Sequence, residues 1–267
     1  MPEKKFFEFK NKTDDSADLY IYGDIVSYKW FENDVTASDF QKELAKIGDV
    51  KTLNIFINSY GGDVFQGQAI YSMLKRNKAT KNVYIDGIAA SCASLIAMAG
   101  DKIIMPANAM MMIHRAWTIG IGNANDFREQ ADLMDKIDES IMATYQAKTG
   151  MEIDKIKELM DAETWMTAEE AKDYGFADEV EAEKLVAASI SGGELIFNGL
   201  SAKLSRFKHP ESIATRFVAH IEEKKPDPPK DPDPDPPKDP EEPRPAPVDF
   251  YKFQILRNER RLKSYGL

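Results

Sequence analysis

The chain has 267 residues, is 43% hydrophobic and 10% aromatic, and carries a net charge of −10 at pH 7. This acidic balance argues against nucleic acid as a partner, and the single cysteine, Cys92, rules out an intrachain disulfide or a metal site built from several cysteines. The longest weakly polar run, residues 87–100, is too short to span a bilayer, and the N-terminal residues lack the apolar stretch of a signal peptide, so we expect a cytoplasmic protein without a membrane partner.

Short apolar runs alternate with helical patterns from residue 5 to residue 181, which is typical of an α/β fold with parallel crossovers. Polar residues able to cap a helix precede the helical patterns. The expected helices run from Thr36 or Ser38 to about Ala45, from Asp63 to about Lys75, and onward from Ser91. The expected strands cover residues 6–9, 19–22, 53–57, 83–85, 102–105 and 110–113.

A long amphipathic helix is predicted over residues 125–147. Its apolar residues recur at steps of three and four, so they form one stripe on a charged rod. A stripe of this kind usually packs into the core, and the alternative is a surface for another subunit. The stripe consists of Phe127, Ala131, Met134, Ile137, Ile141 and Tyr145.

Proline separates the C-terminal part of the chain from the rest, because 11 of the 14 prolines lie between Pro226 and Pro247. Closely spaced prolines remove backbone donors, and the interleaved Asp, Glu and Lys leave little to bury, so residues 226–247 are predicted to be a disordered, polyproline-II-like acidic linker. We divide the chain into a folded domain of residues 1–190, a helical or polar extension of residues 191–225, this linker, and a basic, apolar tail segment of residues 248–267.

Two adjacent glycines, Gly61 and Gly62, follow a predicted strand and precede a helix start. Glycines in this position permit positive φ and leave backbone N–H groups uncovered, which suits an anion or a developing oxyanion. The simpler interpretation is turn geometry, and the pair of glycines alone favours it.

Ser91 also lies between a predicted strand and a predicted helix, among residues too small to shield its hydroxyl. The positive end of a helix dipole favours negative charge at that position. The simpler interpretation is a helix N-cap, which an isolated serine would favour.

His114 ends an apolar strand, whereas His209 and His220 have no acidic or nucleophilic motif around them. A lone histidine at such a position is more often a hydrogen-bonded core residue. With Ser91 at the end of a neighbouring strand, His114 becomes a candidate general base.

A histidine in this role needs a carboxylate to fix its tautomer and stabilise the imidazolium. Glu170 lies three residues after Thr167 in a capping-box pattern, so it needs no catalytic explanation. Asp161 and Glu163 remain as candidates.

In this order, these segments resemble the proteolytic subunit of the Clp protease family. The matching segments are residues 58–62 (Asn-Ser-Tyr-Gly-Gly), 87–91 (Gly-Ile-Ala-Ala-Ser), 112–114 and 166–178, within a resemblance that covers roughly residues 15–185. The resemblance implies a serine peptidase with a crotonase-like α/β fold of stacked βαβ units. It further implies polypeptide substrates, no cofactor or metal, and homo-oligomeric rings, with stacked heptamers as one arrangement.

By motif match, Ser91 is implied as the nucleophile and His114 as the base. The N–H groups of Gly61, Gly62 and Cys92 are implied as the oxyanion hole. Cys92 stands where the family usually has methionine, and Tyr60 stands where it usually has proline. Neither change removes an oxyanion donor, because the donors are backbone N–H groups.

The third member of the family's catalytic group is an aspartate, and the aligned position here is Glu163. Glutamate is longer by one methylene and can still accept from the imidazole. We therefore expect Glu163 in this role, with Asp161 as the alternative.

The Glu-Thr-Trp sequence of residues 163–165 and the long C-terminal extension are similar to the Clp-like peptidases that phages and prophages encode for head maturation. This subgroup implies cleavage of capsid, scaffold or portal proteins, in the host cytoplasm or a procapsid, without an unfolding ATPase. The chain contains no ATP-binding glycine-lysine loop. We expect the tail of residues 248–267 to dock onto such a partner or to be trimmed.

Three alternatives stay open. The first is a cellular Clp subunit served by an ATPase partner. The second is a crotonase-like protein that binds acyl-CoA, which Ser91 and His114 argue against because enolate stabilisation needs no nucleophilic serine. The third is a non-catalytic assembly ring.

Overall fold

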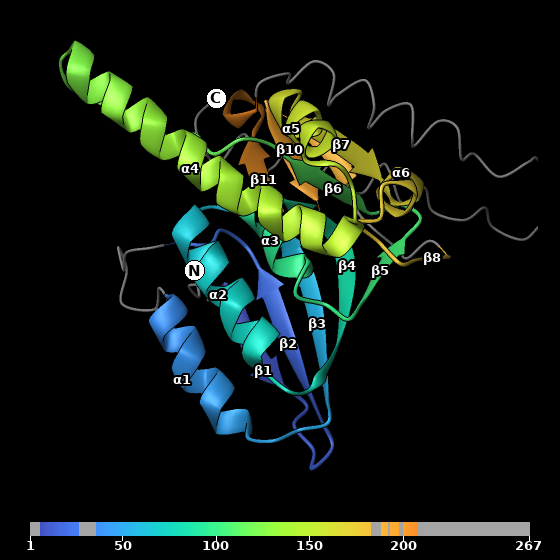
Figure 1. Cartoon of the computed structure of the whole chain (residues 1–267). Coiled ribbons are helices and arrows are strands. Elements are labelled where there is room, and N and C mark those ends of the chain that lie inside the picture. The colour runs from blue at the N-terminus through green and yellow to red at the C-terminus, as the bar shows by residue number, and fades with distance from the viewer. Residues whose placement is uncertain (1–5, 27–35, 183–187, 192, 198–199, 208–267) are drawn as a thin grey trace, which may run out of the picture. The chain divides into compact units, whose positions relative to one another are not determined.

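The computed structural model describes residues 6–26, 36–182, 188–191, 193–197 and 200–207. Its centre is a mixed sheet with helices, so the predicted α/β class is confirmed (Figure 1). Six of its strands are hydrogen-bonded in one line, in the order β1-β2-β3-β4-β5-β8, with β1 antiparallel and the others parallel. They are β1 (Phe7–Lys10), β2 (Ser16–Tyr22), β3 (Thr52–Ser59), β4 (Thr80–Ala90), β5 (Lys102–Pro106) and β8 (Glu179–Glu181).

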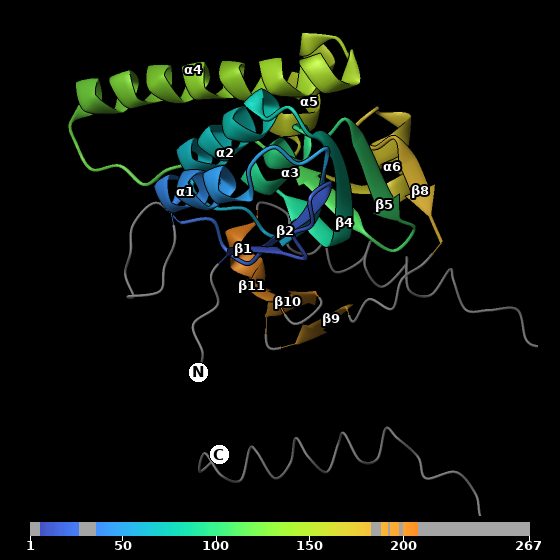
Figure 2. The ribbon, with the colours of Figure 1, turned by 90° about the horizontal axis from the view of Figure 1, so that it is seen from below.

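Six α-helices are described: α1 (Ala37–Ile47), α2 (Val64–Arg76), α3 (Cys92–Ala97), α4 (Ala124–Thr149), α5 (Ile153–Asp161) and α6 (Ala168–Asp173). A short 3-10 helix covers Leu204–Arg206. Helices α1, α2 and α3 lie on one face of the sheet, and α4 lies across them (Figure 2). The predicted cap at Asp63 is present, because its carboxylate accepts from the N–H of Gln66 (2.9 Å). No helix in the described ranges is long and apolar enough to cross a membrane.

Besides β3, strand β4 pairs with two different strands along its length. Its first half pairs with β5, whereas Ile88–Ala90 pair with β6 (Met110–Ile113), which in turn pairs antiparallel with β7 (Thr164–Thr167). This end of the sheet is apolar on both faces. Met111 packs into the large core beneath the helices, and its neighbours Met110 and Met112 pack into a second, smaller cluster. Burial on both sides explains the uninterrupted apolar run of β6.

The second cluster is completed by a small antiparallel sheet formed by β9 (Ala188–Ser191), β10 (Glu194–Phe197) and β11 (Leu200–Lys203). Residues 191–225 were predicted to be a helical or polar extension, and where they are described they include β10, β11 and a single turn of 3-10 helix, with no α-helix in these described residues. Gly193, at φ 78°, lies between β9 and β10 and favours a turn, and the buried Leu195 lies opposite the buried Ala202 in the β10–β11 register. The predicted linker of residues 226–247 and the tail of residues 248–267 lie outside the described residues.

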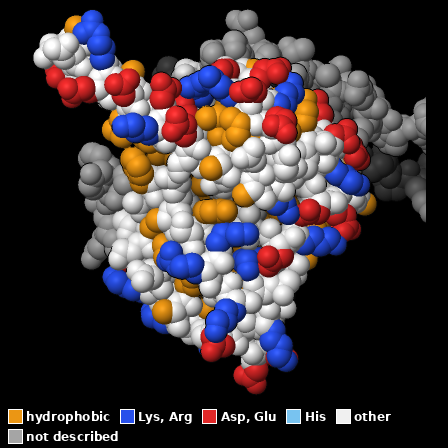
Figure 3. All heavy atoms as spheres, in the orientation of Figure 1, with side chains coloured by type: hydrophobic (Ala, Val, Ile, Leu, Met, Phe, Trp, Pro, Cys, Tyr) orange, Lys and Arg blue, Asp and Glu red, His pale blue; other side chains and the backbone are white. Residues whose placement is uncertain are grey.

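The long helix predicted over residues 125–147 is present as α4, but its apolar stripe is only partly core. Ile141 and Tyr145 are buried, whereas the side chain of Phe127 is 51% exposed. The N-terminal part of α4 extends past the helices beneath it (Figure 1), and the space-filling view shows apolar side chains gathered along its lower edge (Figure 3). Of the two interpretations of the stripe, core or a surface for another subunit, the core interpretation therefore holds for Ile141 and Tyr145 but not for this part of α4.

Candidate active site

Strand register brings Ser91 and His114 together. β4 and β6 run parallel with Ala90 opposite Met112, so the residues that follow the two strands leave the sheet at the same edge. Ser91 follows β4 directly, and its N–H donates to the carbonyl of Met112 (2.9 Å). The Ser91 Oγ lies 2.8 Å from Nε2 of His114. This contact is a hydrogen bond of ordinary length.

The backbone of Ser91 has φ 54°, which is uncommon for a residue with a side chain. Ser91 occupies the N-cap position of α3, yet its side chain makes no capping hydrogen bond. The turn is held instead by Ser94, whose hydroxyl donates to the Ser91 carbonyl (2.6 Å) and contacts the Tyr145 hydroxyl (2.8 Å). The N-cap interpretation therefore does not account for the Ser91 hydroxyl. A strained turn that exposes a serine at a strand-to-helix junction is typical of nucleophiles.

Glu163 reaches the other side of the imidazole. β7 is antiparallel to β6 with Thr164 opposite Ile113, so Glu163 lies beside the end of β6. Its Oε2 lies 4.0 Å from Nδ1 of His114, and its Oε1 accepts from the indole N–H of Trp165 (3.4 Å). The 4.0 Å separation exceeds a hydrogen bond, and such contacts in catalytic sites are often long until substrate binds.

Asp161 is arranged differently. Its carboxylate accepts from Nε of Arg115, and the same guanidinium reaches Asp135 (3.1 Å) and Asp138 (3.2 Å). Hydrogen bonding to Asp161 raises the pKa of Arg115, while burial raises the pKa of Asp138. Asp161 is thus part of an ion-pair cluster, while Glu163 faces the histidine.

The two glycines form a tight turn beside the serine. Gly61 has φ 86° and Gly62 has φ 149°. A Cβ on Gly61 would lie 2.8 Å from the Ser91 Cβ, and one on Gly62 would lie 2.0 Å from the Ile25 carbonyl oxygen, so a side chain at either position collides with its neighbour. The Gly61 N–H donates to Oγ of Ser59 (3.0 Å).

Cys92 follows Ser91 and is 4% exposed. Burial raises the pKa of its thiol to about 12, which hydrogen bonding from backbone N–H groups of Gly62 and Cys92 only partly opposes. The thiol is therefore protonated near neutral pH and is a poor nucleophile.

A cavity of about 370 Å³ opens beside Ser91 and His114. Its walls include apolar side chains of α3 and α4, among them Leu95, Met134 and Ile137. A second cavity, of about 390 Å³, lies on the other side of the imidazole and includes Glu163. The first cavity is of a size that binds part of an organic ligand or peptide.

Sequence analysis did not assign two residues of this region to the site: it named Trp165 only within the Glu-Thr-Trp sequence and did not name Phe207. Trp165 contacts Glu163, and Phe207 lines both cavities. Trp165 lies two residues from Glu163 in a short strand, which was a usable signal, whereas nothing in the polar sequence around Phe207 indicated the site. In the described part of the chain, no group of three or more His, Cys, Asp or Glu side chains is placed to hold a metal ion.

Comparison with known proteins agrees with this geometry. The sequence model of the Clp protease family matches residues 13–184. The chain is 33% identical over 153 residues to an ATP-dependent Clp protease proteolytic subunit of Bacteroides fragilis, covering 55% of this chain and 74% of that protein. It is 36% identical over 139 residues to the subunit of the same name of Pleurastrum terricola, covering 51% and 70%. The chain therefore belongs to the Clp protease family.

Proposed function

We propose that this protein is a serine endopeptidase. Ser91 attacks the peptide carbonyl, His114 takes the hydroxyl proton and later donates it to the leaving amine, and Glu163 stabilises the imidazolium. The observation that carries the proposal is the 2.8 Å contact between Ser91 Oγ and His114 Nε2. Support comes from the backbone of Ser91, whose φ of 54° presents the hydroxyl to the cavity instead of to its own helix.

The proposed oxyanion hole consists of the backbone N–H groups of Gly62 and Cys92. As the first residue of α3, Cys92 has no backbone acceptor for its N–H within the helix, and both this N–H and that of Gly62 approach the Cys92 sulfur, a weak acceptor that a developing oxyanion would replace. Gly61, which sequence analysis placed among the donors, gives its N–H to Ser59, so in this proposal it shapes the turn. Two such donors stabilise a tetrahedral intermediate by several kcal/mol, roughly 3–4 kcal/mol for each.

The proposed substrate is an extended polypeptide with an apolar side chain next to the cleaved bond. Support comes from the walls of the first cavity, which Leu95, Ile137 and Ile141 line together with Ser91. An apolar side chain that enters this cavity is removed from water, and this burial favours binding by roughly 25 cal/mol per Å² of apolar surface.

Labelling with a fluorophosphonate tests the proposal. We expect one adduct on the intact protein, located at Ser91 by peptide mass spectrometry, and no adduct on Ser91→Ala. Peptide hydrolysis by Ser91→Ala should fall by roughly three or more orders of magnitude, because nucleophile and base act as a unit. A fully folded protein that the reagent does not label would contradict the proposal.

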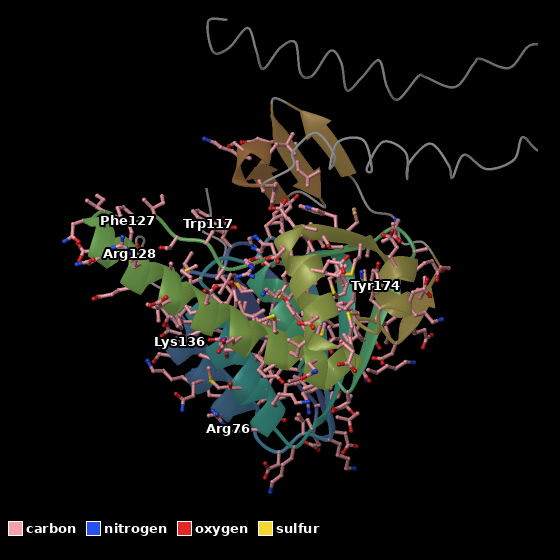
Figure 4. All side chains as sticks on the ribbon, turned by 45° about the horizontal axis from the view of Figure 1, so that its top comes forward. Arg76, Trp117, Phe127, Arg128, Lys136 and Tyr174 are labelled. Carbon is pink, nitrogen blue, oxygen red and sulfur yellow. The ribbon has the colours of Figure 1, made fainter. Side chains whose placement is uncertain are left out.

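We further propose that the protein assembles with copies of itself. The N-terminal part of α4 and the segment before it expose large apolar side chains (Figure 4). Their exposed fractions are 63% for Trp117, 83% for Ile119, 51% for Phe127 and 54% for Leu133. Several large apolar side chains exposed on one helix and the segment before it are typical of an interface. Burying it in a second copy fits a self-compartmentalised peptidase.

Head maturation in a phage or prophage is the biological role we propose, with capsid, scaffold or portal proteins as substrates. The Glu-Thr-Trp sequence of residues 163–165 and the proline-rich linker support it. Removal of residues 226–267 should alter incorporation into particles or self-processing. Unchanged behaviour in both assays would contradict this role.

A cellular Clp subunit served by an ATPase is the second candidate. It is favoured by the relatives, which are named ATP-dependent Clp protease proteolytic subunits. The two roles differ in a simple assay. Degradation of a stably folded protein only in the presence of a Clp ATPase favours the cellular role, whereas limited cleavage of an assembly protein without ATP favours maturation.

A further inference from the structure

The strands that carry the site have two apolar faces, and each needs a cover. One face of β6 and β7, with Met111 and Met166, packs beneath the helices. The opposite face, with Met112 and Trp165, belongs to a separate cluster. Exposed apolar strand surface is unfavourable in water, so whatever covers this second face is part of the folded site.

The cover comes from residues beyond the family match, which ends at residue 184. Leu195 of β10, Ala202 of β11 and Phe207 are buried in the second cluster. Tyr60, beside the glycine turn, donates its hydroxyl to the carbonyl of Leu195 (3.0 Å). The tyrosine that precedes the two glycines therefore ties the turn to this C-terminal sheet.

Phe207 connects the cover to the carboxylate. Its ring meets that of Trp165 edge to face, with centroids 5.0 Å apart and an interplanar angle of 82°. The Trp165 indole N–H donates to Oε1 of Glu163, whose Oε2 is the oxygen nearest to His114. Phe207, Trp165 and Glu163 thus form a continuous line of contacts that ends at the imidazole.

The backbone conformation and the burial of Glu163 explain why its carboxylate needs neighbouring groups to hold it in place. Its φ is 51°, a backbone conformation that residues with side chains adopt rarely. Both Glu163 and Trp165 are buried, at 8% and 3% exposure. A buried carboxylate on a strained residue keeps one orientation only when the groups around it fix that orientation.

We propose that the C-terminal sheet, acting through Phe207 and Trp165, positions Glu163 against His114, so that this extension is a working part of the active site. Phe207 and Trp165 are positioning residues, since neither touches the reacting atoms. The inference rests on the proposed function, because it concerns the reactivity of Ser91.

The test measures the second-order rate of Ser91 labelling by a small fluorophosphonate without a peptide portion, which separates reactivity from peptide binding. Five variants of the full chain are compared with the intact protein: Phe207→Ala, Phe207→Tyr, Trp165→Phe, the double variant of Phe207→Ala with Trp165→Phe, and Leu204→Ala. Leu204 packs against the same cluster, lies in neither cavity lining, and serves as the matched control.

We expect labelling to slow by about tenfold to a hundredfold in Phe207→Ala and in Trp165→Phe, because a small displacement of a catalytic group has this effect. The double variant should be no slower than the slower single variant, because both changes remove the same contact line. Phe207→Tyr, which keeps the ring, should restore the rate. Leu204→Ala should lower the thermal midpoint while its labelling rate stays within about twofold of the intact protein.

Three results would overturn the inference. The first is labelling at the intact rate in folded Phe207→Ala. The second is a double variant whose losses multiply, since independent losses indicate a general structural role. The third is labelling of Trp165→Phe at the rate of the intact protein, which is the result to be used if Phe207→Ala does not fold. These results are distinct from failure of the proposed function. If the intact protein itself is not labelled at Ser91, the proposed function is wrong and the inference is wrong with it. If the intact protein is labelled and the variants are labelled at the same rate, only the inference is wrong.

Discussion

Ile113 lies opposite Thr164 in the antiparallel pairing of β6 and β7. This register puts the residue after Ile113 and the residue before Thr164 at the same end of the pair, so His114 and Glu163 face each other. A shift of one residue would turn every side chain of β7 to the other face. The choice of Glu163 as the proposed third catalytic residue therefore rests on this strand pairing.

Substitution of the two candidate carboxylates should give very different results. Glu163→Gln should lower kcat by about a thousandfold or more, because the amide cannot stabilise an imidazolium. Asp161→Asn should lower it by less than about tenfold, because Asp161 pairs with Arg115 instead. Steady-state hydrolysis of an apolar fluorogenic peptide by both variants gives the comparison, and urea unfolding checks that both are folded. The opposite ranking would transfer the role to Asp161.

The sequence predicted β6 because an uninterrupted apolar run leaves few alternatives, and the expected strand of residues 110–113 has the bounds observed for β6. It predicted only residues 83–85 of β4 and no strand over residues 164–167, where β7 lies beside Glu163. The exposed half of α4 could not be predicted in this way, since a stripe that contacts core and a stripe that contacts another chain have the same period. The role of Phe207 could not be predicted from the sequence either. Its contact with Trp165 joins residues 42 positions apart through a sheet of three short strands in a polar segment.

Cys92 should be unreactive in the folded protein. With the thiol pKa raised to about 12 by burial, only about one molecule in 10,000 carries a thiolate at pH 8. Iodoacetamide should therefore leave the native protein unmodified while it alkylates the urea-unfolded protein, as intact mass spectrometry would show. Cys92→Ala should keep its labelling at Ser91, because the proposed oxyanion donor at this position is a backbone N–H. Rapid alkylation of the native protein, with matching loss of activity, would argue for the thiol as nucleophile.

Gly62 should not tolerate a side chain. The added Cβ of Gly62→Ala would lie 2.0 Å from the Ile25 carbonyl oxygen, so the turn must move and displace the proposed oxyanion donor. We expect the labelling rate at Ser91 to fall at least about a hundredfold. Gly150→Ala is the matched control: Gly150 also has positive φ, at 69°, but a Cβ there meets no atom within 4 Å. That variant should lose only about 1 kcal/mol of stability and keep its labelling rate.

The pairing of Asp101 with Lys81 should make stability depend on pH. Burial acts to raise the pKa of Asp101, but the backbone N–H and ammonium of Lys81 outweigh it, and the net pKa is lowered. A lowered carboxyl pKa stabilises the folded state above the unfolded-state pKa of 3.8, and this contribution is lost as pH falls through the folded-state value. The Lys81 side chain is 6% exposed and that of Asp101 is 50% exposed.

Asp101→Asn should therefore lower the free energy of unfolding by only about 0.5–1 kcal/mol at pH 7, because water screens the half-exposed carboxylate and the Lys81 ammonium keeps the carbonyl of Ala79 as an acceptor. The difference from the intact protein should shrink below pH 4. Urea unfolding at pH 7 and pH 3 gives both values, with Glu139→Gln, at an exposed position of α4, as the control for a lost negative charge. An equal difference at both pH values would contradict the role of the pair.

The exposed apolar side chains of α4 should control assembly. Phe127→Ser combined with Leu133→Ser removes two large apolar groups, each more than half exposed, from one helix. If a second copy covers this surface, the variant should move toward the mass of a single chain in light scattering after gel filtration, because the apolar burial that stabilises the contact is lost. Glu129→Ser, on the exposed surface of the same helix, controls for changes in helix propensity and should keep the mass of the intact protein. An unchanged mass in the double variant, with helix content preserved by circular dichroism, would show that α4 does not hold the copies together.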